Sequence, residues 1–252
     1  MFEVTVDLLL MLLGAAFLAG FVDAIAGGGG LITLPALLLA GASPIEALST
    51  NKVQGSFGAA TAAIAYARAG QVDLRAQRVP AAMALVAGLI GAFLATRLPM
   101  ETLHLIIPVI LIAVALFFAL KPGLTDDDQV ERIKPAVFTA LFVPLVGTYD
   151  GMIGPGAGAF YMIGFVTLAG YGILKATAHT KVLNFSSNIG GLAVFAIFGA
   201  TWWLTGIAMG IAQVAGAALG AKLALRVGAA VIRPLLVITA VALALRVFVQ
   251  ML

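Results

Sequence analysis

A motif that combines one aspartate with a cluster of glycines occurs twice in this chain, each time inside a long apolar run. The first copy is Gly20-Phe21-Val22-Asp23-Ala24-Ile25-Ala26-Gly27-Gly28-Gly29-Gly30. The second copy is Gly147-Thr148-Tyr149-Asp150-Gly151-Met152-Ile153-Gly154-Pro155-Gly156-Ala157-Gly158. Apolar segments that glycine and proline interrupt at matching places of two halves are typical of transporter binding sites in membranes.

The composition is typical of an integral membrane protein. Of its 252 residues 62% are hydrophobic and 10% are charged, whereas soluble domains are about half apolar and about a quarter charged. Apolar runs with almost no charge recur along the whole length, at 4–25, 79–96, 103–120, 135–146 and 231–252. The sequence therefore predicts an all-α polytopic membrane protein embedded in a lipid bilayer.

Several classes of function are excluded by what the chain contains. Its net charge of +3 is small and scattered, so we expect no nucleic-acid partner. It has no cysteine, which excludes disulfides, thiolate metal sites and cysteine catalysis. Two histidines, His104 and His179, leave little for a metal centre. We expect no metal and no cofactor.

The two halves match well beyond the glycine motif. Asp23 corresponds to Asp150 at an offset of 127, and after a slip of two residues Lys52 corresponds to Lys181 at an offset of 129. The second offset then holds for some fifty residues, as far as Arg97, which corresponds to Arg226. Agreement of charged and glycine positions over this length indicates a tandem duplication. We therefore divide the chain into repeat 1 (1–121), a cytoplasmic linker (122–133) and repeat 2 (134–252).

Each repeat is expected to contain five apolar segments. They lie at 4–26, 30–42, 46–66, 79–96 and 102–120, and at 134–153, 157–171, 176–198, 203–221 and 229–251. The second segment of each repeat is short for a hydrocarbon core of about 30 Å, so it is either a crossing or a half-spanning helix that returns as a hairpin. Both versions give an odd number of crossings, which predicts two inverted-topology repeats.

Loop charges give the orientation independently. The connection 67–79 carries three arginines and one aspartate, which predicts a cytoplasmic position. Its equivalent at 199–204 is uncharged. One loop later the bias reverses, because Lys222, Arg226 and Arg233 crowd the connection in the second repeat. Both termini are then periplasmic, and the Ala- and Gly-rich composition is typical of a bacterial inner-membrane protein.

The glycine clusters are candidates for binding an anion. Glycine lets backbone amides face a ligand, and the amides at a helix N-terminus form a site for negative charge. We therefore predict substrate contacts from Gly28, Gly29, Gly30, Gly156, Ala157 and Gly158. The alternative is tight helix packing by small residues, as expected for the Gly216–Gly220 pattern within one chain or across a homodimer.

Polar side chains follow early in the third segment of each repeat. Asn51 and Lys52 lie in the first copy, and Lys181, Asn184 and Asn188 lie in the second. A polar face inside a membrane helix is costly unless it lines a cavity or pairs with a neighbour, so we predict that these residues line a substrate cavity. The alternative for the lysines is that they snorkel to the interface.

Three ionisable groups are candidates for coupling transport to a proton gradient: Asp23, Asp150 and His179. The alternative for the aspartates is purely structural, because Asp before a helix commonly accepts hydrogen bonds from loop amides. His104 has no counterpart in the other repeat and is expected at the membrane interface.

The residues resemble the TauE/SafE family. The first glycine motif, Leu34-Pro35-Ala36-Leu37 and Ala47-Leu48-Ser49-Thr50-Asn51 are similar to the family's first half. Gly154-Pro155-Gly156 and Ala176-Thr177-Ala178-His179-Thr180-Lys181-Val182-Leu183-Asn184-Phe185 are similar to its second repeat. The resemblance implies a transporter of small sulfur-containing anions, such as sulfite, sulfoacetate or other organosulfonates, and export is the direction that it implies.

We therefore predict a secondary transporter of such anions that works by alternating access and is not an enzyme. No Gly-x-x-x-x-Gly-Lys-Ser/Thr motif occurs, which argues against ATP-driven transport by this chain alone. The alternatives are a passive anion channel, a transporter of another small organic anion, a non-transporting membrane subunit, and an intramembrane enzyme with His179 as its base.

Overall fold

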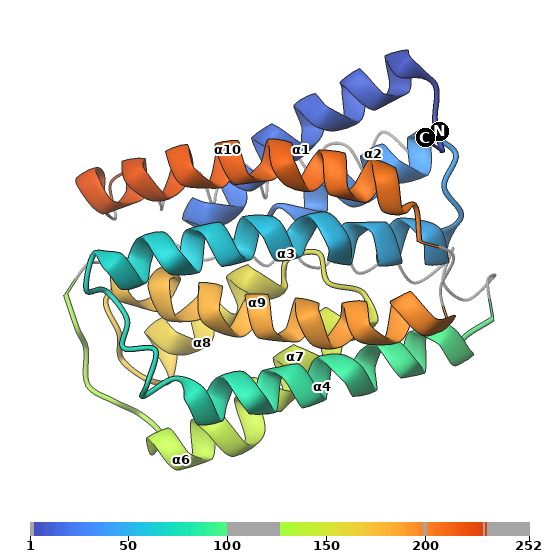
Figure 1. The fold of residues 1–252 in the computed structure, drawn as a ribbon. Helices are drawn as coiled ribbons and strands as arrows, with labels where there is room; N and C mark the ends of the chain where they lie inside the picture. The colour runs from blue at the N-terminus through green and yellow to red at the C-terminus, as the bar shows by residue number, and fades with distance from the viewer. Residues whose placement is uncertain (1–2, 100–126, 199–200, 229, 231–252) are drawn as a thin grey trace, which may run out of the picture.

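The computed structural model describes residues 3–99, 127–198, 201–228 and 230. Every regular element in these ranges is a helix, as the sequence predicted (Figure 1). Within these described ranges, four helices are long and apolar enough to cross a membrane: α1 (Val6–Ala26), α4 (Arg78–Arg97), α9 (Ile173–Phe198) and α10 (Trp203–Val227). Helix α3 (Pro44–Arg68) has a similar length and carries more polar residues. The predicted segment 102–120 with His104, and almost all of 229–251, lie outside the described residues.

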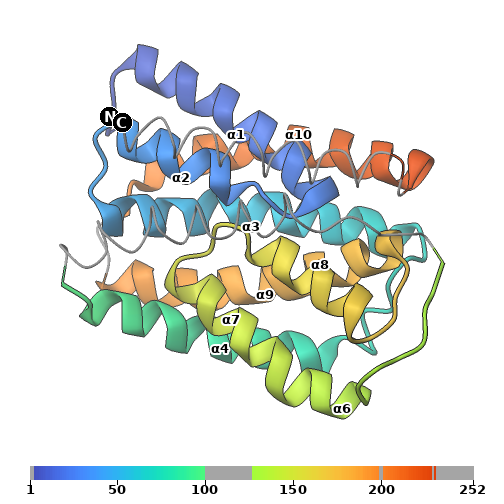
Figure 2. The same cartoon turned by 180° about the vertical axis from the view of Figure 1, so that it is seen from behind.

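In each half of the chain a half-length helix follows the glycine motif. Helix α1 is followed by α2 (Gly30–Leu39), and α6 (Pro135–Val137), the π-helix η1 (Phe138–Phe142) and α7 (Val143–Met152) are followed by α8 (Ala157–Thr167). With 10 and 11 residues, α2 and α8 extend about 15 Å, half of a hydrocarbon core of about 30 Å. They are too short to cross. Both lie on the face of the bundle that is turned toward the viewer in Figure 2.

Helix α3 and helix α9 form the centre of the bundle, and the other helices pack on them reciprocally. Helix α10 packs on α3 and α1, while α4 packs on α9 and α7. The colours of Figure 1 show that α3 and α9 run in opposite directions, and that α4 and α10 do the same. Equivalent helices of the two halves are therefore antiparallel in the described part of the chain.

A capping box fixes where α3 begins, and with it the position of the polar residues that follow. The Ser43 N–H donates to the carboxylate of Glu46 at 2.7 Å, and the Glu46 N–H donates to the Ser43 hydroxyl at 3.5 Å. Pro44 occupies the first helical position, where no N–H is needed. Asn51 and Lys52 consequently lie two turns into the helix, inside the bundle.

The Gly216–Gly220 pattern packs two helices of one chain. A Cβ atom at Gly216 would overlap the carbonyl of Phe17, and one at Gly220 would overlap the carbonyl of Phe21, both in α1. Close backbone approach of this kind is what small residues permit in membrane helices. The structure therefore assigns this pattern to packing within the protomer.

Candidate functional site

Two buried ion pairs join the halves of the protein where the helices are broken. The ammonium group of Lys52 lies 2.7 Å from the Asp150 carboxylate, and that of Lys181 lies 3.0 Å from the Asp23 carboxylate. In each pair the lysine belongs to one half and the aspartate to the other. Both lysine side chains are 0% exposed, so the alternative that they snorkel to an interface is wrong.

Asp150 is surrounded by donors. Its carboxylate accepts hydrogen bonds from the Asn184 side-chain amide at 2.7 Å and from the Ser187 hydroxyl at 2.5 Å, in addition to Lys52. The Lys52 ammonium also donates to the backbone carbonyl of Asp150. The residue is 1% exposed. All of these side-chain partners donate to the carboxylate, so its oxygens are occupied by hydrogen-bond donors.

Asp23 has fewer donors and more open surroundings. Its carboxylate accepts from the Lys181 ammonium and from the backbone N–H of Gly29 at 3.2 Å, and its side chain is 13% exposed. The bond from Gly29 is the loop-amide contact that the structural alternative predicted. Asp23 combines that contact with a buried ion pair and keeps free acceptor capacity.

The two glycine loops contact each other directly. The Ala159 N–H donates to the carbonyl of Gly27 at 3.2 Å. Gly27 has a φ of 80°, and a Cβ atom there would lie 2.5 Å from the carbonyl carbon of Gly158. Glycine is required at Gly27 for both reasons, the positive φ and the close approach. The packing alternative is therefore realised at Gly27 and Gly158, where backbone meets backbone.

A small cavity of about 30 Å³ lies between these loops and the central helices. Its volume accommodates about one water molecule. It is lined from both halves, by Asp23, Gly27, Gly30, Asn51, Gln54, Gly55, Asp150, Gly154, Gly156, Gly158, Asn184, Asn188 and Gln213. The structure thus brings both aspartates, the three asparagines and three of the six predicted cluster positions to one cavity.

Other predicted residues lie behind this lining. Gly28, Gly29 and Ala157 do not line the cavity, and neither do Lys52 and Lys181, whose ammonium groups point to the aspartates. Gly29 instead lies against Asp23, because a Cβ atom at Gly29 would be 2.8 Å from that of Asp23. These residues support the cavity walls.

The polar residues at the centre that the sequence prediction did not name as site residues include Thr33 and Gln213. Thr33 donates to the side-chain oxygen of Asn51 at 2.7 Å, which orients that amide. Gln213 lines the cavity from α10 and is 2% exposed. A signal for Gln213 as an interior residue was present, because it interrupts the apolar stretch between Thr205 and Lys222 and such residues mark interior sites in membranes.

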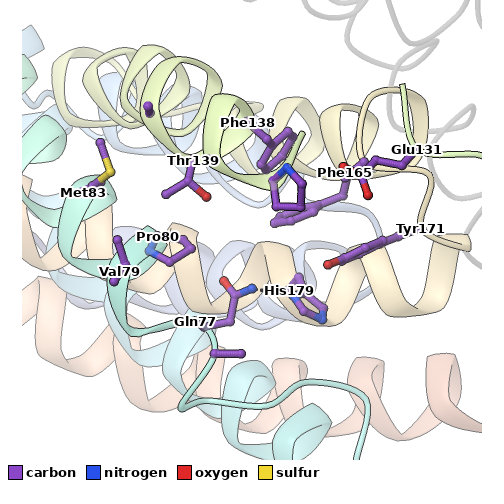
Figure 3. Close-up of a pocket in the computed structure, with 15 residues that line it drawn as sticks. Gln77, Val79, Pro80, Met83, Glu131, Phe138, Thr139, Phe165, Tyr171 and His179 are labelled. Carbon is purple, nitrogen blue, oxygen red and sulfur yellow. Dashed lines mark hydrogen bonds between the residues drawn. The ribbon is translucent and has the colours of Figure 1, made fainter. Parts of the chain in front are cut away.

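His179 lies in a separate and larger pocket, of about 600 Å³, between α4, η1, α8 and α9 (Figure 3). Its Nδ1 atom is 2.6 Å from the side-chain nitrogen of Gln77, and its ring contacts those of Phe165 and Tyr171. The pocket contains neither Asp23 nor Asp150. The structure therefore does not bring His179 to the two aspartates with which the sequence grouped it.

Comparison with known proteins gives consistent matches over nearly the whole chain. The family model described as "Sulfite exporter TauE/SafE" matches residues 12–247. A "Probable membrane transporter protein ORF9" of Sinorhizobium sp is 53% identical, over 97% of this chain and 94% of its own length. "Probable membrane transporter protein YfcA" of Escherichia coli K12 is 44% identical, over 94% and 88%. No solved structure matches.

Proposed function

We propose that this chain, which belongs to the sulfite exporter TauE/SafE family, is a secondary transporter that exports small sulfur-containing anions such as sulfite or organosulfonates. Family membership and the relatives establish a multi-pass membrane transporter of the TauE/SafE type. The substrate class, the direction and the mechanism are proposals that draw on the site.

The main support for this function is that two ion pairs cross between the halves, Lys52 with Asp150 and Lys181 with Asp23. Two buried lysines beside broken helices supply the positive charge that an anion needs. The amide ends of α2 and α8 add the favourable ends of two helix dipoles. In our proposal the anion binds between the loops, with side-chain contacts from Lys52, Lys181, Asn51 and Asn184.

The cavity volume indicates which step must accompany binding. A cavity of about 30 Å³ is smaller than a sulfite ion, and both lysines are occupied by aspartates. Substrate entry in this proposal separates the two halves enough to widen the cavity and release an ammonium group. Because the ion pairs join the halves, such a movement necessarily changes the distances within them. In this way alternating access would be coupled to substrate binding.

We further propose that the halves are inverted repeats in a bacterial inner membrane, with both termini in the periplasm. The antiparallel directions of α3 and α9 and of α4 and α10 support the inversion (Figure 1). The reciprocal ion pairs support it as well, since an inverted duplication places equivalent residues around a common axis. The boundaries proposed for the repeats are 1–121 and 134–252, with 122–133 as a cytoplasmic linker.

Transport by the purified full-length chain in proteoliposomes tests the function. We expect radiolabelled sulfite or a sulfonate to exchange across the membrane, and to accumulate against its gradient when an ion gradient is imposed. Exchange without uphill accumulation would instead indicate a passive anion channel. No saturable flux of sulfite, sulfonates or small carboxylates would contradict the proposal.

We propose no catalytic step. The relatives carry transporter names, and an intramembrane enzyme would need a nucleophile beside a base. His179, the base that such an enzyme requires, pairs with Gln77 in a pocket that neither aspartate lines.

A further inference from the structure

Two buried glutamines that line the central cavity each have an amide oxygen that receives no hydrogen bond from the described residues. Gln54 on α3 is 1% exposed and Gln213 on α10 is 2% exposed. Both line the cavity of about 30 Å³, and the Oε1 atom of each lacks a partner in the described part of the chain. A buried polar atom without a partner is costly, so these two oxygens indicate a ligand.

The hydrogen bonds of Gln54 establish which of its amide atoms is free. Its nitrogen donates to the Thr33 hydroxyl at 3.0 Å and to the Asn51 side-chain oxygen at 2.7 Å. Thr33 itself donates to that same Asn51 oxygen, so the Thr33 oxygen is left to accept. Exchanging the oxygen and nitrogen of Gln54 would place its oxygen against two acceptors. With the Asn51 amide in this orientation, the unpartnered atom of Gln54 is an oxygen.

The surroundings of these oxygens supply further acceptors. The carboxylates of Asp23 and Asp150 line the same cavity. Asp150 is occupied by Lys52, Asn184 and Ser187, whereas Asp23 retains acceptor capacity. The C-terminal ends of α1 and α7, which are the negative ends of their helix dipoles, reach the same loops. Broken-helix transporters commonly bind their coupling cation at such helix ends.

We infer that this cavity binds a sodium ion, with the amide oxygens of Gln54 and Gln213 and the carboxylate of Asp23 as ligands. A proton would not satisfy two amide oxygens, because amides do not titrate near neutral pH. A divalent cation normally takes several carboxylates, and the described residues contain no group of three or more Asp, Glu or His side chains placed for a metal. A single monovalent cation fits the volume and the one carboxylate with free capacity.

The duplication provides only one such pair of glutamines. At the offset of 129, the positions equivalent to Gln54 and Gln213 are Leu183 and Ala84, and both are fully buried. No amide oxygen is available at those equivalent positions. The geometry therefore gives one cation per chain, even though the ion pairs occur twice.

Sodium at this site also bears on substrate binding, a step that rests on the function proposed above. Sodium and Lys181 would share the carboxylate of Asp23, which lies 3.0 Å from the Lys181 ammonium. A bound cation weakens the ion pair between Asp23 and Lys181, so that the Lys181 ammonium becomes available to an anion. Binding of sodium and of the anion would then favour each other.

Binding of radioactive sodium to the purified full-length chain tests the inference without any anion or transport. We expect saturable binding that unlabelled sodium displaces and that choline does not. Gln213→Leu should weaken the affinity by about tenfold or more, because the cation loses one of its oxygen ligands. The matched control is Gln77→Leu, which removes another buried glutamine whose oxygen lacks a partner among the described residues, but in the pocket of His179.

A second variant covers the case in which Gln213→Leu fails to fold. Gln213→Glu keeps an oxygen at the site and adds a negative charge, so sodium should bind at least as tightly as in the wild type. No saturable sodium binding by the wild-type chain would overturn the inference, as would unchanged affinity in Gln213→Leu or weakened affinity in Gln213→Glu. Sulfite exchange by the same preparation separates the two proposals, because exchange without sodium binding contradicts only this one. Sodium binding without exchange contradicts only the proposed substrate.

Discussion

The ammonium group of Lys52 lies 2.7 Å from the carboxylate of Asp150, which is 98 positions further along the chain. The side chains of the two residues are 0% and 1% exposed. The reciprocal pair, Lys181 with Asp23, is 3.0 Å apart and is slightly more open on the side of Asp23. The halves are thus connected by two unequal ion pairs. The Lys52–Asp150 pair, here called the sealed pair, is surrounded by further donors, whereas in the Lys181–Asp23 pair, the open pair, the carboxylate keeps free acceptor capacity. We expect the sealed pair to serve mainly stability and the open pair to respond to ligands.

Replacing Asp150 by Asn should destabilise the protein by about 3–5 kcal/mol, because the Lys52 ammonium then remains buried without its counter-charge. Asp23→Asn should cost less, since Asp23 is partly exposed and accepts fewer hydrogen bonds. Thermal unfolding of the two purified variants in detergent measures the difference. A lower melting temperature for Asp23→Asn than for Asp150→Asn would contradict this order.

The control for this prediction removes both charges of the sealed pair. Lys52→Met combined with Asp150→Leu leaves no buried charge unpaired, so the double variant should be more stable than Asp150→Asn. It should also transport no anion if Lys52 is a substrate contact.

The contact between the glycine loops should be sensitive to a single methyl group. Gly27→Ala places a Cβ atom 2.5 Å from the Gly158 carbonyl carbon, at a positive φ. Gly41 is the matched control, because it also has a positive φ of 96° but no atom within 4 Å of an added Cβ. Gly41→Ala should cost only the backbone strain of about 1–2 kcal/mol. Gly27→Ala should lower the melting temperature further and abolish transport, and equal effects of the two substitutions would refute the close approach.

The sequence predicted the helical elements well, and the reason is physical. Apolar runs in a membrane must be helical to satisfy their own backbone, so their lengths and their glycine breaks directly give α1, α4, α8 and α10. Membership of the site was harder to predict. The repeat offset identified Asp23 with Asp150 and Lys52 with Lys181 as equivalents, but equivalence along the chain does not show which residues touch across the halves.

The misplaced grouping of His179 has a geometric cause. His179 and Lys181 are two positions apart on α9, and residues at that spacing point to nearly opposite sides of a helix. Lys181 consequently faces Asp23 while His179 faces Gln77. The sequence marks Gln213 as an interior residue of its helix, but its place at this cavity depends on how α10 packs on α3, which a single sequence does not give.

Opposite orientation of the halves can be tested directly, because the chain contains no cysteine. Arg75 and Trp203 are exposed residues in equivalent connections of the two repeats. A membrane-impermeant maleimide should label Trp203→Cys in intact cells and Arg75→Cys only after the membrane is opened. Labelling of both positions from the same side would contradict the inverted topology.

The linker contact at Asp128 predicts a small dependence of stability on pH. The hydrogen bonds from Lys175 and from the Gly172 amide hold the pKa of Asp128 below its ordinary value of 3.8. The folded state therefore binds this proton more weakly than the unfolded state, so the stabilisation is present above pH 3.8 and is lost as the pH falls through the lowered pKa. Because the Asp128 side chain is 54% exposed, the gain should be below about 1 kcal/mol.

Asp128→Asn measures this contribution. Its melting temperature should be slightly below that of the wild type at neutral pH, and the difference should vanish in acid below the lowered pKa. Asp127→Asn is the control, since its side chain makes no ion pair among the described residues and should change little. If the melting temperature of Asp128→Asn stayed below that of the wild type in acid, the contact would stabilise the fold without the charge of Asp128.

Lys181→Gln tests whether the open ion pair takes part in binding the anion. Its control is Lys175→Gln on the same helix, where the ammonium is 41% exposed and pairs with Asp128. Loss of a charge-assisted hydrogen bond costs about 1.5–3 kcal/mol, so KM for sulfite in proteoliposomes should rise about tenfold or more in Lys181→Gln and stay unchanged in Lys175→Gln. Transport is normalised to folded protein by gel filtration, because Lys181→Gln also leaves Asp23 without its counter-charge. An unchanged KM in folded Lys181→Gln would remove this lysine from the substrate site and restrict it to holding the halves together.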